Sequence, residues 1–320
     1  MLSRDQDRVV RAEANILLDE LGVTTYPIDP DAIARQKEVV VQDVPGFPDG
    51  VYGALCRKDS RFEILVSDRC PNEGMRRFSV SHELGHYMLP GHVDEMFRKS
   101  DELIPSTGGH YRRKDRFELE ADTFASELLV PTRFARQIVR AGRPTLESII
   151  TLSETFNVSL VAAAIRTVEL TDEAMAIVLS HDGTCEWCSR SPALAEHAWS
   201  KKVLKREMVP LGSATRRLSK DTHGVQRLNR VTDTSPLSIW FDEAPGDLEV
   251  VEEAMGLGEY GRVMTVMTFE DVPDSDELYL REQRLRRREV DDAIASQAVQ
   301  STRGDWRRPL RDFHWDDEEE

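Results

Sequence analysis

The chain lacks the features of a membrane or secreted protein. No apolar run approaches the ~20 residues that a membrane span needs, and the N-terminus, MLSRDQDRVVRAE, has no apolar signal-peptide core. Four cysteines in 320 residues are too few for a disulfide framework. Basic residues number 42 against 58 acidic ones, and the net charge of −16 disfavours direct DNA binding and anionic membranes. We therefore predict a cytoplasmic protein that does not bind membranes.

One short motif carries most of the chemical information in the sequence. It is H-E-L-G-H at residues 82–86, within RRFSVSHELGHYML. Residues at i and i+4 share a helix face, so His82 and His86 can bind one metal ion, with Glu83 beside them as the general base of a hydrolase. The alternative is a surface helix with two stray histidines, but an amphipathic helix does not need this spacing. The spacing alone predicts a zinc hydrolase with one catalytic Zn²⁺.

A catalytic zinc usually takes three protein ligands, so a third is expected. Glu118 is the first candidate, because Asp122 follows one turn later and can accept the free N–H of a ligand histidine. His92 is the second, since H-E-x-x-H-x-x-G-x-x-H places a third histidine there, although Leu89 stands where that motif needs glycine for its turn. Four other residues remain possible as the third ligand: Asp94, Glu95, His110 and Glu120.

Hydrolysis at a carbonyl group also needs a hydrogen-bond donor for the developing oxyanion. The side chains near the motif in sequence offer several donors, which the sequence does not rank. These candidates are Tyr87, His92, His110 and Tyr111.

The pattern of polar and apolar residues changes along the chain, which predicts an α+β protein in four parts. Residues 1–130 form an N-terminal zincin-like peptidase domain with a small mixed sheet, because strands are expected before the motif helix of about 72–89. Residues 131–171 form a helical, helix-turn-helix-like segment. Residues 172–274 form a β-rich regulatory or interaction domain, with strands expected at 174–180, 206–210, 238–241 and 262–269. Residues 275–320 form a charged helix and an acidic tail.

Two motifs, RRFSVSHELGHYML and ELEADTFASELLVP, together resemble the ImmA/IrrE family of intracellular zinc metallopeptidases. The resemblance runs from about residue 10 to about residue 169, with two small departures, at Ser81 and Val130. It implies that His82, His86 and Glu118 bind the metal, that Glu83 is catalytic, and that Asp122 supports a ligand. It also implies selective cleavage of a DNA-binding repressor, often a helix-turn-helix protein of phage, mobile-element or stress-response origin.

Two hypotheses for the function follow. The first is a site-specific zinc endopeptidase that cleaves a helix-turn-helix transcriptional repressor or antitoxin. The second is a regulatory protein that binds a DNA-binding partner with little or no proteolysis. Glu83 favours the first hypothesis, because a pure scaffold needs no general base.

Two weaker signals lie outside the motif. LSETFNVSLVAAAIRTVE at 152–169 has the outline of a DNA-reading helix-turn-helix, but Arg166 is its one good base or phosphate contact. Cys185 and Cys188 form a single C-x-x-C, which is either half of a metal site or, as we expect, a tight turn between strands with reduced thiols.

Overall fold

The structure is a computed structural model that describes residues 2–58, 61–98, 104–106, 116–201, 207–244, 248–258 and 261–269, together with Arg287. The chain divides into two units, Met1–Glu270 and Asp271–Glu320. The charged helix and acidic tail predicted for 275–320 lie outside the described residues, except for Arg287. The predicted α+β class, with a small mixed sheet followed by a β-rich part, is confirmed.

The first two helices begin at the residues that their sequences favour. Helix α1 (Arg4–Glu20) starts at Ser3, which forms a capping box with Gln6. Helix α2 (Pro30–Gln36) starts at Asp29, whose side chain accepts a hydrogen bond from a backbone N–H of the first turn, and proline occupies the first helical position. Both helices contribute buried residues to the core around the motif helix.

Four strands form the first sheet, in the order β1-β3-β2-β4. Strand β1 (Val40–Val44) pairs in parallel with β3 (Arg61–Ser67), and β2 (Gly53–Lys58) pairs antiparallel with β3 and with β4 (Ile104–Ser106). Strand β2 therefore has a strand on each side. Of the three strands before the motif helix, only β1 keeps an outer edge without a strand partner among the described residues.

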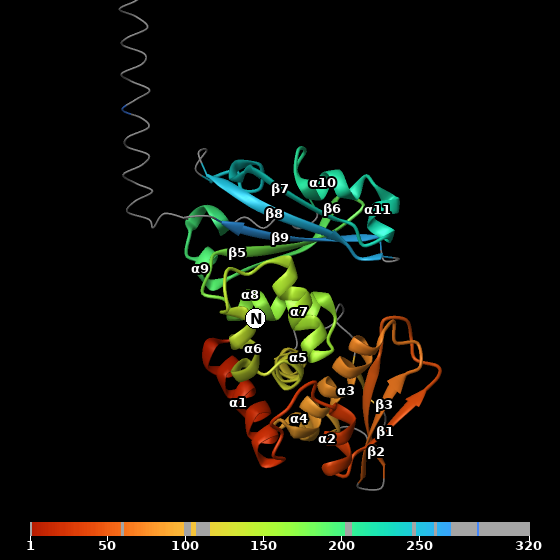
Figure 1. Cartoon of the computed structure of the whole chain (residues 1–320). Helices are drawn as coiled ribbons and strands as arrows, with labels where there is room; N and C mark the ends of the chain where they lie inside the picture. The colour runs from red at the N-terminus through yellow and green to blue at the C-terminus, as the bar shows by residue number, and fades with distance from the viewer. Residues whose placement is uncertain are drawn as a thin grey trace, which may run out of the picture. The chain divides into compact units, whose positions relative to one another are not determined.

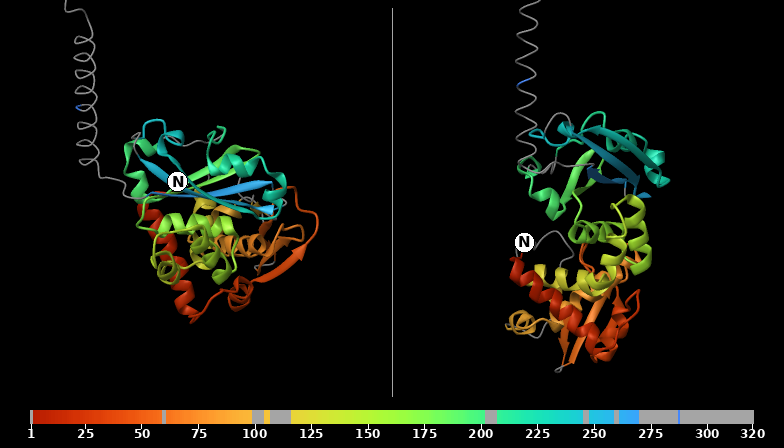
Figure 2. Two further views of the ribbon diagram at one scale, coloured as in Figure 1. Left: turned by 45° about the horizontal axis from the view of Figure 1, so that its top comes forward. Right: turned by 60° about the vertical axis from the view of Figure 1, so that its left-hand side comes forward.

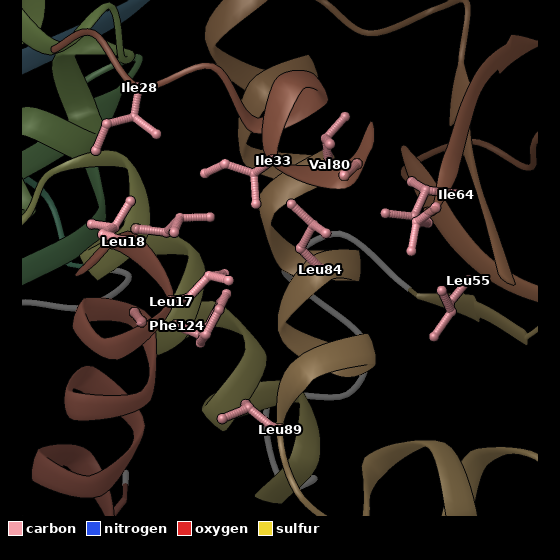
Figure 3. Close-up of a cluster of buried hydrophobic side chains, with 14 of the residues drawn as sticks. Leu17, Leu18, Ile28, Ile33, Leu55, Ile64, Val80, Leu84, Leu89 and Phe124 are labelled. Carbon is pink, nitrogen blue, oxygen red and sulfur yellow. The ribbon is translucent and has the colours of Figure 1, made fainter. Parts of the chain in front are cut away.

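Helix α3 (Glu73–Met88) carries the H-E-L-G-H motif between this sheet and helix α5 (Arg116–Leu129). Its Val80 and Leu84 are fully buried in the hydrophobic core, where they point among side chains of the sheet and of neighbouring helices (Figure 3). The surrounding side chains of this core include Leu17, Leu18, Ile28, Ile33, Leu55, Ile64 and Phe124. One face of α3 is thus held by apolar packing, which positions its polar face.

Five antiparallel strands form the second sheet, in the order β6-β5-β9-β8-β7. This sheet is separate from the first one (Figure 2). Helices α10 and α11 pack on it from one side, and helix α8 (Leu160–Leu170) packs against β5 and β6 (Figure 1). The bounds are β5 Met175–His181, β6 Thr184–Arg190, β7 Arg230–Pro236, β8 Glu249–Gly256, β9 Arg262–Phe269, α10 Ala214–Ser219 and α11 Thr222–Gln226.

Three helices follow α5 and lead to the second sheet: α6 (Thr132–Val139), α7 (Leu146–Phe156) and α8. They share one hydrophobic cluster with β5 and β9, and the domain boundaries at 130 and 171 stay predictions. No single helix of the described chain has both the length and the apolar character to cross a membrane. Helices α7 and α8 meet that criterion only as a pair, and they are bent by 113° from each other.

Two of the four strands expected in this region were wrong. Of the strand expected at 206–210, the described residues 207–210 provide an isolated bridge between Met208 and Thr184. The range 238–241 overlaps the short 3-10 helix Leu237–Ile239. Strands β6, β7 and β8 were not anticipated. In β8 the fully buried Glu252 accepts hydrogen bonds from Ser235 and from the indole N–H of Trp240, so a charged residue occupies a position where the alternation rule expects an apolar one.

The remaining short helices are α4 (His92–Met96), α9 (Pro192–Ala195) and η1 (Ala198–Lys201).

Candidate metal centre

Helix α3 is anchored to its neighbours by polar side chains before it reaches the motif. Asn72 caps its first turn by accepting a hydrogen bond from the Met75 N–H. The guanidinium of Arg77, which is buried, donates to the carbonyl oxygens of Ile28 and Asn157, at 2.6 and 3.1 Å. These bonds tie α3 to the segment before α2 and to the turn between α7 and α8, which fixes the helix that presents the histidines.

Helix α5 brings a carboxylate to the two histidines of α3. His82 Nε2 and His86 Nε2 lie 3.1 Å apart. Glu118 Oε2 is 3.5 Å from His82 Nε2, and Glu118 Oε1 is 3.6 Å from His86 Nε2. Both histidines are buried, and Glu118 is largely buried. Among the described residues, these three side chains form a group of donor atoms able to hold a metal ion.

The separations within this group fit a small tetrahedral cation. Bonds of about 2.05 Å at the tetrahedral angle place two ligand atoms about 3.3 Å apart, and the three separations here are 3.1, 3.5 and 3.6 Å. Two imidazoles and one carboxylate are also the donor set of a catalytic zinc with one position open. The residues present therefore fit the metal that the motif predicts.

Acidic side chains surround His82 and change its protonation. Its Nδ1 lies 2.9 Å from Asp122 Oδ1, on the ring edge opposite the shared point of the three donors. Burial opposes a charge on His82, but Asp122, Glu118 and Glu83 outweigh burial and raise the pKa of this imidazole to about 10. Three carboxylates around two imidazoles give the site an excess of negative charge, which favours a cation.

His86 has a different environment behind its ring. Its Nδ1 lies 3.1 Å from Nδ1 of the fully buried His92. Burial, together with the neighbouring His82 and His92, holds the pKa of His86 well below its usual range. His92 Nε2 lies 3.0 Å from Glu120 Oε2, and Arg116 Nε donates to Glu120 Oε1 at 2.7 Å.

These contacts correct two expectations about His92 and Glu120. His92 lies behind His86, on the side away from Glu118 and His82, and both of its ring nitrogens have partners. Glu120, another candidate for the third ligand, is only 6% exposed, and its carboxylate pairs with His92 and Arg116. Burial would raise the pKa of Glu120, but Arg116 and His92 outweigh this effect and lower it. The i,i+4 spacing of Arg116 and Glu120 was the available sequence signal for this contact.

Glu83 lies on α3 beside the two histidines and is fully buried. Its carboxylate packs against strand β2 at Gly53, where an added Cβ would stand 2.9 Å from Glu83 Oε1 and 3.4 Å from Ser79 Cβ. Only a residue without a side chain leaves this space to the carboxylate. Gly53 therefore helps to position Glu83, and sequence reasoning did not single it out.

The other candidate site residues do not join the group formed by His82, His86 and Glu118 among the described residues. Tyr87 is one position along α3 from His86, about 100° round the helix, and its ring packs 5.2 Å from that of Phe62 on β3. Asp94 and Glu95 are exposed on α4. His110 and Tyr111, which were candidate donors, lie outside the described residues.

The two weaker sequence signals also have structural outcomes. Arg166 is buried and donates to Glu127 at 2.8 Å, and Glu169 is the exposed residue of α8, so this helix presents no exposed basic side chain. Cys185 and Cys188 lie within strand β6, which corrects the expected turn. Burial raises the pKa of their thiols to about 11 and about 12, which disfavours the reactive thiolates.

Comparisons with known proteins agree with this geometry. Residues 46–168 match the family Peptidase_M78, whose description is IrrE N-terminal-like domain. Over 73 residues the chain is 37% identical to "Uncharacterized immunity region protein 2" of Bacillus phage phi105, a match that covers 23% of this chain and 41% of that relative. The fold is similar to a solved structure titled "Mycobacterium tuberculosis transcriptional regulator", with a TM-score of 0.51, 17% identity, and coverage of 83% of this chain and 77% of that one.

The matched segment contains β2, β3 and α3, and it extends through α5 to α8. It therefore includes His82, Glu83, His86 and Glu118, the side chains that the fold gathers around one point. The family is one of metallopeptidases, and the two histidines and one glutamate supply a donor set for its metal. The chain carries an IrrE N-terminal-like domain of the Peptidase_M78 family over residues 46–168.

Proposed function

We propose that this protein is a zinc-dependent endopeptidase with one catalytic Zn²⁺. The observation that carries the proposal is the convergence of His82 Nε2, His86 Nε2 and the Glu118 carboxylate, with buried Glu83 beside them. When bound, zinc would polarise the scissile carbonyl and lower the pKa of water from 15.7 to about 7. Asp122 would hold His82 in the tautomer that leaves its Nε2 free to bind the metal.

Glu83 is the residue that we assign to proton transfer. Its carboxylate would take a proton from the attacking water and deliver it to the leaving amine. The fully buried position of Glu83 excludes bulk water from this carboxylate, and Gly53 leaves room for it against β2. A peptide that reaches β2 as an added strand would meet β4 on its outer edge, so we expect the substrate to pair with β4 or to displace it.

We further propose that the substrate is a helix-turn-helix transcriptional repressor or an antitoxin, cleaved in the cytoplasm. The name of the phage relative, an immunity region protein, and the resemblance to the ImmA/IrrE family support a regulatory substrate. In this proposal residues 1–130 carry the peptidase activity, 131–171 form a helical segment, and the β-rich region 172–274 has a regulatory or interaction role.

The test is co-expression of the full chain with the helix-turn-helix protein encoded beside it, followed by intact-mass measurement. Wild type is compared with Glu83→Gln, which removes the general base, and with Glu73→Gln, which makes the same chemical change at an exposed position on the first turn of α3. We expect fragments with wild type and Glu73→Gln, and an intact partner with Glu83→Gln at unchanged zinc content.

The other outcomes separate the two functions. A partner that co-purifies uncut with wild type and with both variants would favour the regulatory binding protein over the peptidase. Fragments that appear equally with Glu83→Gln would contradict the role of Glu83. A partner that is neither cut nor bound would overturn the proposed substrate class.

A further inference from the structure

We propose that His92 and Glu120 are positioning residues that hold His86 in the orientation and tautomer needed to bind the metal. This inference rests on the proposed zinc site. It concerns four side chains from three helices, joined by hydrogen bonds in a series that runs from the metal ligand to the surface. The members are His86 on α3, His92 on α4, and Glu120 and Arg116 on α5.

The direction of every hydrogen bond in this series follows from its two ends. His86 Nε2 lies with the other two donor atoms and must be unprotonated to bind a metal. The proton of a neutral His86 therefore resides on Nδ1, which donates to His92 Nδ1 at 3.1 Å. His92 must then accept at Nδ1 and carry its own proton on Nε2, which donates to Glu120 Oε2 at 3.0 Å. The sequence of donors and acceptors is consistent throughout.

Glu120 ends the series with a charge-assisted bond. Its Oε1 accepts from Arg116 Nε at 2.7 Å, while its side chain is only 7% exposed. An ionised carboxylate only accepts hydrogen bonds, so it can bind only the N–H tautomer of His92 Nε2. Glu120 thus selects the tautomer of His92, and His92 in turn selects that of His86.

The two metal-binding histidines therefore have supports of different kinds. His82 donates directly to Asp122, whose side chain is 45% exposed. His86 donates to a neutral imidazole that is 1% exposed and is itself held by a carboxylate. Because the support of His86 is buried between α4 and α5, it also links the metal ligand to the placement of α4, whose first residue is His92.

The test measures zinc affinity of the full chain by chelator competition, together with the visible spectrum of the cobalt-substituted protein. His92→Phe keeps a ring next to Phe117, which His92 contacts edge-on at 4.7 Å, but removes both hydrogen bonds. His92→Asn keeps a carbonyl acceptor near the position of Nδ1. The control is His197→Phe, a partly buried histidine that stacks on Trp199 outside the site.

We expect His92→Phe to bind zinc about 10- to 100-fold more weakly than wild type, His92→Asn to recover part of this loss, and His197→Phe to match wild type. The shape of the cobalt spectrum should stay that of wild type, because the number of ligands is unchanged. A cobalt spectrum of altered coordination in His92→Phe would overturn the proposal by showing that His92 is itself a ligand. Wild-type zinc affinity in His92→Phe would also overturn it.

A second variant keeps the test decisive if His92→Phe does not fold. Glu120→Gln removes the charge that selects the His92 tautomer, and we expect weaker zinc binding from it as well. Glu95→Gln, the same change on the exposed surface of α4, should have no effect. Unchanged zinc affinity in Glu120→Gln would overturn the proposed positioning of His86 by His92 and Glu120. A wild-type protein that binds no zinc would instead overturn the proposed metal site on which this inference rests.

Discussion

Replacing Gly85 by alanine should weaken metal binding while the protein stays folded. Gly85 is the fourth residue of the H-E-L-G-H motif, where α3 packs against α5. An added Cβ would stand 3.2 Å from Ala121 Cα, 3.2 Å from Phe124 Cδ1 and 3.3 Å from the Ala121 carbonyl oxygen. Favourable carbon–carbon contacts are about 3.5–4.0 Å, so the two helices would have to separate locally by roughly 0.3–0.8 Å.

Two opposing terms set the effect on stability. Overpacking of a core typically costs about 1–3 kcal/mol, and replacing glycine by alanine within a helix gains about 1 kcal/mol. The net loss should therefore be about 0–2 kcal/mol. Zinc–ligand distances tolerate only about 0.2 Å, and Glu118 lies on α5, three residues before Ala121. We therefore expect zinc affinity to fall at least about tenfold, which corresponds to about 1.4 kcal/mol.

The assay is chelator competition for zinc, with the free energy of unfolding of the metal-free protein measured by urea denaturation. Gly142→Ala is the matched control, because no atom lies within 4 Å of its added Cβ, and its zinc affinity should equal that of wild type. Wild-type affinity in a folded Gly85→Ala protein would refute the inference that this close helix crossing sets the position of Glu118.

Other substitutions test the remaining contacts. Gly53→Ala should displace the Glu83 carboxylate and lower kcat at least about tenfold, with the zinc content unchanged. This loss lies within the factor of about 10²–10⁴ that a general base contributes. A wild-type kcat would contradict the role of Gly53. Arg166→Met should leave the buried Glu127 carboxylate with weaker compensation and cost about 3 kcal/mol in urea unfolding. Burial would raise the pKa of Glu127, but Arg166 and nearby hydrogen bonds lower it overall. Stability from Glu127 is therefore fully present above its unfolded pKa of about 4.5 and is lost as the pH falls through the lower folded value, and Glu127→Gln should flatten this acidic part of the stability profile.

Features that depend on residues close together in the sequence could be predicted, and features that depend on distant residues could not. The motif helix, the small mixed sheet and the α+β class could be predicted because they depend on spacing within one element or on alternation along one strand. The second sheet was predicted less well, since strand β8 places Glu252 in the interior. Its partners, Ser235 and Trp240, come from other segments of the chain. Periodicity reports the polarity of a side chain, and it does not report a partner that makes burial of that side chain possible.

His92 shows the same limit at the metal centre. Its distance from the motif in sequence allowed it to be a third ligand, and the missing glycine at Leu89 argued only against one particular turn. The chain turns instead at Gly91, which has a φ of 80° in the left-handed region. Helix α4 then begins at His92 and places this ring behind Nδ1 of His86, opposite the Nε2 that faces Glu118. Sequence spacing limits how far His92 can lie from His86. The conformation of one glycine decides which nitrogen of His86 the ring of His92 contacts. It thereby decides whether His92 would bind the metal or would position His86, which binds it.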